Sequence, residues 1–99
     1  MARPAKLSPE EVTSALGSLP GWSVVDGKLH REYKFPDFAQ AFGFMATVAT
    51  AAEKLDHHPD WLNVYNRVTV NLSTHDVGGI TELDLKLAMT METIAQKLQ

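Results

Sequence analysis

The 99-residue sequence predicts an α+β fold, a four-stranded antiparallel sheet with three helices packed on one face in the order αββαββα. Three observations support this prediction. Asp26-Gly27 separates two segments with alternating apolar residues, the pattern of a β-hairpin. A long helical pattern covers residues 37–55. A second pair of alternating segments and a final helical pattern complete the order, and we expect residues 1–99 to form a single domain.

The first helix is predicted to begin after Ser8, because Ser8, Pro9 and Glu11 have the pattern of a capping box. Gly17 and the Pro20-Gly21 pair should end it after about two turns. The first two strands, residues 22–25 and 29–33, should then join through a type I′ turn.

In that hairpin the turn residues are Asp26 and Gly27, which tolerate the positive φ that a type I′ turn needs at both positions. A two-residue turn places Val24 opposite Leu29, so their side chains share one face of the sheet. His30 then falls on the other face and is interpreted as a surface histidine.

The longest helix is predicted to start with Asp37 as its N-cap and to end before Pro59, since the residue before a proline avoids helical geometry. The pair His57-His58 therefore lies in a loop just after the helix. The predicted buried stripe consists of Phe38, Phe42, Met45, Ala49 and Ala52, widened by Phe44, Val48 and Leu55.

Two further strands are predicted from apolar residues that alternate with polar ones at Leu62 and Val64, and then over residues 68–72. If Val64 and Val68 are partners on one face, the turn must have an odd number of residues, and 65–67 fits. His75 follows the last strand, shortly before Gly78-Gly79.

The last helix is predicted to open at Thr81, with Glu82 and Asp84 in its first turn, where acids suit the helix dipole. Its buried stripe is predicted to contain Leu87, Met91, Ile94 and Leu98. Helix capping is sufficient to explain Asp84 without a catalytic role.

Composition excludes several classes of function. A net charge of -3 without a basic run argues against nucleic acid as a partner. Residues 38–52 form the longest apolar-leaning run, shorter than the ~20 residues of a membrane span, so we expect no membrane attachment. The absence of cysteine excludes thiolate catalysis and cysteine zinc sites. No apolar stretch typical of a secretory signal follows the first residues, and we expect a cytoplasmic protein.

Three of the four histidines, His57, His58 and His75, lie close together in the sequence beside carboxylates. This pattern is typical of either proton transfer or metal binding. Adjacent histidines rarely reach one ion and no H-x-x-x-H spacing is present, so the acid–base interpretation fits better. Histidines that only cap loops remain the structural alternative. Trp61 and Tyr65 could line a ligand pocket, or serve as ordinary core or interface aromatics.

The spacing of these residues resembles that of the pterin-4a-carbinolamine dehydratases, also known as dimerisation cofactors of a homeodomain transcription factor. The resemblance rests on Glu53-x-x-x-His57-His58-Pro59, then Tyr65, His75 and Asp84, and covers roughly Trp22 to the C-terminus. It implies an enzyme that dehydrates 4a-hydroxytetrahydrobiopterin to quinonoid dihydropterin without a metal or an organic cofactor, supporting the recycling of tetrahydrobiopterin.

The resemblance also implies roles for individual residues. The catalytic positions are His57, His58 and His75, with the acid–base work at His57 and His75 while His58 orients the pterin. The implied substrate-binding set is His57, His58, Pro59, Thr74, His75, Asp76 and Val77. The implied supporting set is Glu53, Asp56, Trp61 and Asp84. Which of His57 and His75 is the acid stays open.

By the same resemblance we expect a homotetramer or homodimer, with sheets joined edge to edge and long helices bundled. The competing hypothesis is a protein-binding or dimerisation module that uses the helix over residues 37–55 and has little or no catalytic role. A metal-binding module is a third, weaker hypothesis.

Overall fold

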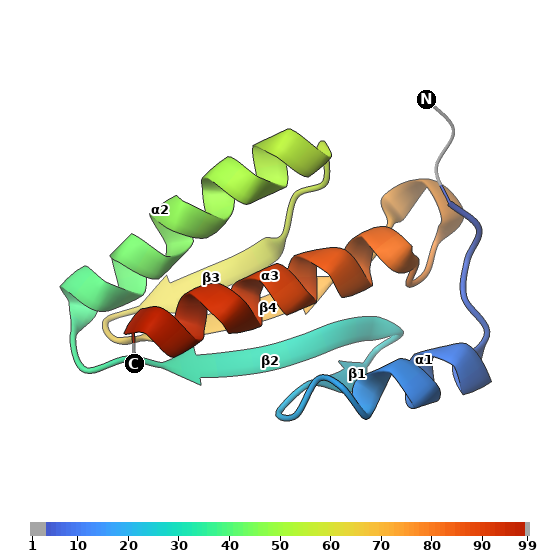
Figure 1. Ribbon diagram of the computed structural model, residues 1–99, viewed down its shortest axis with the longest axis horizontal. Coiled ribbons are helices and arrows are strands. Elements are labelled where there is room, and N and C mark those ends of the chain that lie inside the picture. The colour runs from blue at the N-terminus through green and yellow to red at the C-terminus, as the bar shows by residue number, and fades with distance from the viewer. Residues whose placement is uncertain (1–3, 99) are drawn as a thin grey trace.

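The computed structural model describes residues 4–98 and has the predicted αββαββα order, with one additional short 3-10 helix. The four strands form one antiparallel sheet in the order β1-β2-β4-β3, and the helices pack on one face of it (Figure 1). The elements are α1 (Pro9–Leu16), β1 (Ser23–Val25), β2 (Lys28–Lys34), α2 (Phe38–Leu55), β3 (Asp60–Val64), β4 (Arg67–Leu72), the 3-10 helix η1 (His75–Val77) and α3 (Glu82–Leu98).

Both predicted helix caps are confirmed. At the start of α1, Ser8 Oγ accepts from the Glu11 amide at 3.1 Å, and Glu11 Oε1 accepts from the Ser8 amide at 2.8 Å. Hydrogen bonding by the backbone amide and by the side chain of Ser8 lowers the pKa of the Glu11 carboxyl, because it favours the charged form. At the start of α2, Asp37 Oδ1 accepts from the Gln40 amide at 2.8 Å.

The first hairpin also has the predicted register. Asp26 and Gly27 have φ of 52° and 75°, and Val24 pairs with Leu29. From this register the alternation along β2 follows, with Leu29 and Tyr33 buried under the helices and His30 on the opposite face.

The predicted three-residue turn between the last two strands is wrong. Val64 pairs with Arg67, so the turn contains only Tyr65 and Asn66, and Tyr65 adopts a φ of 50°. Asn63 Nδ2 holds this turn by donating to the carbonyls of Tyr65 and Arg67, at 3.0 and 2.8 Å. As a consequence Leu62 and Val64 lie on the face away from Val68, where they are 64% and 50% exposed.

The predicted buried stripe of α2 is correct in part. Phe44, Val48 and Ala52 are buried, together with Ala41, but Phe38 and Phe42 are 51% and 58% exposed, and Ala49 is also exposed. The helix has apolar residues on more than one face, so its periodicity alone does not select the face that meets the sheet.

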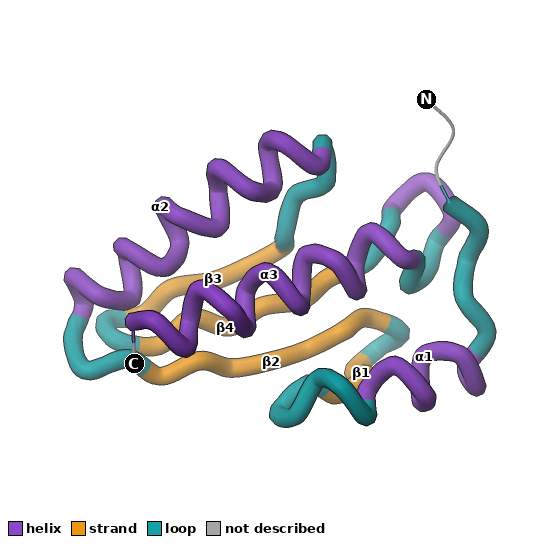
Figure 2. Tube along the Cα trace, viewed as in Figure 1, coloured by secondary structure: helices purple, strands orange, loops and turns teal. Residues whose placement is uncertain are grey.

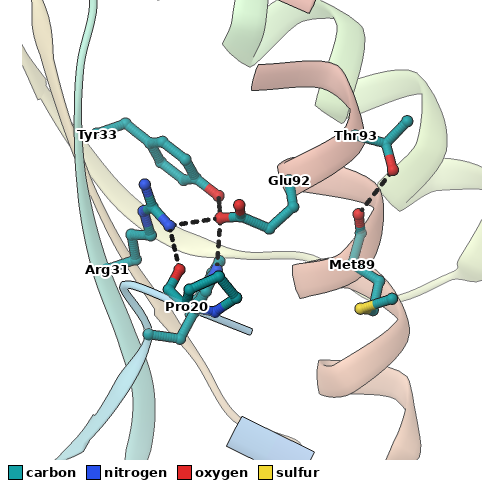
Figure 3. A network of polar contacts seen from close by, with 7 residues as sticks. Pro20, Arg31, Tyr33, Met89, Glu92 and Thr93 are labelled. Carbon is teal, nitrogen blue, oxygen red and sulfur yellow. Dashed lines mark hydrogen bonds and ion pairs between the residues drawn. The ribbon is translucent and has the colours of Figure 1, made fainter. Parts of the chain in front are cut away.

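In α3, Leu87 and Met91 are buried as predicted, and Ile94 and Leu98 pack at the edge of the core. The same helix carries a polar cluster that the sequence did not indicate (Figure 3). Glu92 Oε1 accepts from Trp22 Nε1 at 2.9 Å, Arg31 at 2.7 Å and the Tyr33 hydroxyl at 2.5 Å. One carboxylate oxygen thereby links α3 to β2 and to the residue that precedes β1.

The ends of several helices and strands meet at one end of the sheet. The loop after α2, the exit of β4 and the start of α3 all lie there, close to the β1–β2 turn (Figures 1 and 2). The Tyr65-Asn66 turn lies at the opposite end of the β3–β4 hairpin. Over residues 4–98, no helix combines the length and the apolar character that crossing a bilayer requires.

Candidate active site

The candidate site lies at this end of the sheet, and the C-terminus of α2 positions its first residues. Asp56 takes a left-handed conformation, with φ of 52°, and turns the chain out of the helix. The His57 amide still donates to the Ala52 carbonyl at 3.1 Å, so the backbone of His57 is tied to the last turn of α2. The histidine pair therefore has a defined position immediately after the helix.

The two neighbouring histidines have different environments. His57 is buried, with 6% of its surface exposed, and its Nε2 lies 2.5 Å from Asp84 Oδ1. The side chain of His58 is 58% exposed, and its Nε2 donates to Glu53 Oε1 at 2.8 Å. Successive side chains thus point apart, one into the fold and one towards solvent.

Asp84 is fully buried, and each of its oxygens has a partner. Oδ2 accepts from the Thr81 amide and from Thr74 Oγ1, both at 2.9 Å, while Oδ1 faces His57. Thr74 and Thr81 are also hydrogen-bonded to each other through their hydroxyls at 2.7 Å. The predicted capping role of Asp84 is confirmed by the Thr81 contact, and the contact with His57 is an additional role.

This network determines which nitrogen of a neutral His57 ring carries the proton. A carboxylate only accepts hydrogen bonds, so Nε2 must carry the proton that points to Asp84. In the neutral ring Nδ1 then has a free lone pair. Within residues 4–98 no side chain or backbone group bonds to Nδ1, so it is the nitrogen that a ligand can meet. The arrangement is suited to accepting a proton from a ligand.

His75 enters the site on the short helix η1. The loop that carries it is closed by two backbone bonds between Thr74 and Gly79, at 2.7 and 3.4 Å, and ends with Gly78 at a φ of 63°. His75 itself is exposed. A loop closed by backbone bonds thus presents an accessible imidazole that shares a cavity with His57.

A cavity of about 180 Å³ brings these groups together. Its lining consists of Asp56, His57, His58, Ser73, Thr74, His75 and Asp76. Glu53 reaches the site through His58, and Asp84 reaches it through His57. Pro59, Trp61 and Val77 are half-buried and do not line this cavity. Tyr65 lies at the far end of the hairpin, so it does not form an aromatic wall here.

Thr81 also belongs to the site, although the sequence alone does not assign it a functional role. Thr81 was predicted only as the start of α3, yet its amide and hydroxyl both belong to the buried network around Asp84. The spacing Thr81-x-x-Asp84 is that of a capping motif, and it was the available signal. Over residues 4–98, no three histidine or acidic side chains converge in a geometry that could hold a metal ion.

Fold and site together define a small α+β protein with a histidine–carboxylate cluster suited to acid–base chemistry. The model of the family described as pterin 4 alpha carbinolamine dehydratase matches residues 5–94. A protein of Solibacter usitatus named "Putative pterin-4-alpha-carbinolamine dehydratase" is 57% identical over 90 residues, covering 91% of this chain and 95% of the relative. A protein of Brucella ovis with the same name is 54% identical over 92 residues, covering 91% and 95%.

A solved structure gives the same result for the fold. The crystal structure described as the transcriptional coactivator/pterin dehydratase from Brucella melitensis matches with a TM-score of 0.88 at 54% identity, covering 91% of this chain and 98% of the other. The chain therefore belongs to the pterin 4 alpha carbinolamine dehydratase family. The family match begins at residue 5, so the resemblance extends further towards the N-terminus than Trp22.

Proposed function

We propose that this protein dehydrates 4a-hydroxytetrahydropterins, such as 4a-hydroxytetrahydrobiopterin, to quinonoid dihydropterins. The observation that carries the proposal is the buried His57–Asp84 pair, which meets the exposed His75 across one cavity. Membership of the family supports the same substrate class. Dehydration needs one group that accepts a proton and one that donates a proton near neutral pH, and histidine suits both tasks.

In the proposed reaction the bond between C4a and the hydroxyl oxygen breaks while the lone pair of N5 forms the N5=C4a double bond. His75 donates a proton to the departing hydroxyl, which leaves as water. His57 Nδ1 accepts the proton that N5 loses, because Asp84 keeps the proton of the neutral ring on Nε2. No net oxidation or reduction takes place, and the proton balance of the two histidines is restored through solvent.

Stopped-flow measurement of carbinolamine breakdown tests this proposal. We expect His75→Ala and His57→Ala each to lower kcat/KM by roughly 10²–10⁴-fold, the range for loss of a general acid or base. His30→Ala is the matched control, because His30 bonds to Asn71 and does not line the cavity. A His75→Ala enzyme with the wild-type rate would refute the assignment.

A second candidate function is a protein-binding or dimerisation module, and the exposed aromatic side chains of α2 favour it. Phe38 and Phe42 are exposed neighbours with ring centroids 6.1 Å apart. The Brucella melitensis relative is described as both a transcriptional coactivator and a pterin dehydratase, so the two functions are not exclusive. If the wild-type protein left carbinolamine breakdown at the uncatalysed rate, this second function would be preferred.

We also propose that the chain assembles into a homodimer or homotetramer. β3 is an edge strand, and its outward residues Leu62 and Val64 are exposed, which is unfavourable for an isolated sheet edge in water. Pairing of β3 with another copy would satisfy its free backbone groups. A monomer at all concentrations in analytical ultracentrifugation would refute this proposal.

A further inference from the structure

We propose that the segment before α1 positions His75, because Lys6 and Leu7 hold the loop that carries this histidine. The loop consists of residues 74–79 and is called the His75 loop below. The inference rests on the proposed function, in which His75 is the acid. Lys6 and Leu7 do not line the histidine cavity, so they would act through the loop and not on the substrate. In Figure 1 the dark blue segment before α1 runs beside the orange loop that precedes α3.

A backbone hydrogen bond ties the two segments together. The Leu7 amide donates to the Ile80 carbonyl at 2.8 Å, and the side chain of Leu7 packs against the core. Ile80 directly follows Gly79, whose carbonyl accepts from the Thr74 amide at 2.7 Å. Two successive backbone bonds therefore connect the segment before α1 to Thr74, the residue that precedes His75.

The side chain of Lys6 supplies a second contact with the loop. A Cβ atom built on Gly79 would lie 2.5 Å from Lys6 Cε and 2.8 Å from Lys6 Cδ, closer than real Cβ atoms approach other atoms. The aliphatic part of Lys6 therefore lies directly on the backbone of Gly79, an arrangement that leaves the ammonium free to stay in water. Gly78 has a positive φ, but Gly79 does not. The contact with Lys6, rather than the backbone conformation, is thus what excludes a side chain at position 79.

The His75 ring has no orienting partner of its own. The two other histidines of the site each have a carboxylate partner, Asp84 for His57 and Glu53 for His58. Across residues 4–98, by contrast, no hydrogen bond or ion pair holds the exposed imidazole of His75. The position of this imidazole therefore depends on the backbone of the His75 loop.

The side of the His75 loop that faces α1 is incompletely packed. A cavity of about 400 Å³ lies there, and its lining includes Gly78 and Gly79 from the loop and Val12 and Thr13 from α1. A segment that borders a cavity has fewer packing contacts to fix it than a segment in the core. The contacts made by the segment before α1 are therefore a substantial part of what holds the loop on this side.

Loss of these contacts should affect proton transfer more than substrate binding. A misplacement of about 1 Å can lower a rate by about 10²-fold. His75 would move with its loop, whereas His57 and His58 keep their carboxylate partners in the histidine cavity. We therefore expect kcat to fall while KM changes little.

Kinetics of carbinolamine dehydration test the proposal with two single variants and their combination. Lys6→Ala removes the aliphatic contact and Gly79→Ala displaces it, so each should lower kcat by about tenfold and change KM by less than about twofold. The double variant should also lose about tenfold, and not about a hundredfold, because both changes remove the same contact.

Two further variants serve as controls. Lys6→Met keeps the aliphatic length without the charge, so its kcat should stay within about twofold of the wild-type value. Lys86→Ala removes an exposed lysine of α3 that does not line the histidine cavity, and it should leave kcat unchanged. Wild-type kcat in Lys6→Ala, a hundredfold loss in the double variant, or a Lys6→Met enzyme as slow as Lys6→Ala would each overturn the inference.

Two measurements that do not require activity separate this inference from the proposed function. In Lys6→Ala we expect the Thr74 amide to exchange its hydrogen about tenfold faster and the ¹H–¹⁵N signals of the His75 ring to shift, while Lys6→Met keeps the wild-type values. Unchanged exchange and unchanged ring signals in Lys6→Ala would overturn the inference. If the wild-type protein does not dehydrate the carbinolamine, the proposed function fails, and these two measurements alone decide whether Lys6 positions His75.

Discussion

Replacement of Asp84 by Asn tests whether this residue controls the protonation of His57. The amide of Asn has one acceptor and one donor end, and the Thr81 amide requires the acceptor at the position of Oδ2. The NH₂ group must then face His57 Nε2. Nε2 becomes an acceptor and the ring proton moves to Nδ1, which removes the lone pair that the proposed reaction uses.

The size of the effect follows from which contacts survive. The two bonds to Oδ2 have equivalents in Asp84→Asn, so we expect the free energy of unfolding to fall by only about 1–2 kcal/mol, mainly through the charge lost near the N-terminus of α3. In contrast, kcat/KM should fall by roughly 10²–10⁴-fold, because a general base is lost. Glu82→Gln is the control, since it removes an exposed acid from the same helical turn.

Two measurements decide the outcome of this test. Stopped-flow kinetics give kcat/KM, and ¹H–¹⁵N correlation spectra of the histidine rings report which nitrogen of His57 carries the proton. We expect a protonated Nε2 in the wild type and a protonated Nδ1 in Asp84→Asn. The role of His57 Nδ1 as the base would be refuted if Asp84→Asn showed the expected change of tautomer but kept kcat/KM within threefold of the wild-type value.

Three further predictions concern other parts of the molecule. His58→Gln should raise KM more than it lowers kcat in steady-state assays, because His58 is exposed and, among the described residues, its side chain bonds only to Glu53; a loss confined to kcat would contradict a positioning role. Burial and Glu92 raise the pKa of Tyr33 above its ordinary 10.0, so above about pH 10 the unfolded chain binds fewer protons than the folded one and stability falls with rising pH. Urea unfolding at pH 9–11 should show this loss of stability in the wild type but not in Tyr33→Phe. The same pH dependence of the free energy of unfolding in both proteins would contradict the prediction. Val64→Lys on the exposed edge strand should shift the protein towards monomer in ultracentrifugation, whereas an unchanged assembly would exclude β3 as the interface.

The features that the sequence predicted correctly depend on local chemistry. The Asp26-Gly27 turn and the Ser8 cap are each specified by residues within a few positions of one another, so their geometry follows from short patterns. The same holds for the exit of α2, which places His57 and His58 in a loop. These elements were sufficient to obtain the order of the fold and the location of the histidine pair.

The errors arose where burial depends on distant partners. The three-residue turn was predicted on the assumption that Val64 is buried like Val68, but Val64 is exposed and a two-residue turn follows. In α2 the pattern could not distinguish the face of Phe44 from that of Phe42, because both are apolar. Side chains exposed in a single chain are compatible with burial in an assembly, and sequence periodicity does not separate the two cases.

The sequence could predict which histidines of the candidate site lie together, but not how their environments differ. His57 and His58 are adjacent and chemically identical, and only the contact with Asp84, 27 positions along the chain, makes one of them buried and oriented. Asp84 is similar: the sequence explains it as a capping residue, and the structure adds that its second oxygen contacts His57.

The two contacts of Asp84 determine how substitutions in the candidate site affect stability and activity. The same carboxylate caps helix α3 through Thr81 and orients the ring of His57, so we expect a substitution at Asp84 to affect both folding and the proposed proton transfer. His58 is exposed in the loop after α2 and His75 is exposed on the short helix η1, so we expect their replacement to leave the core contacts unchanged. Loss of activity without loss of stability is therefore expected at His58 and His75, whereas at Asp84 the two can be separated only by a variant such as Asn that keeps the cap.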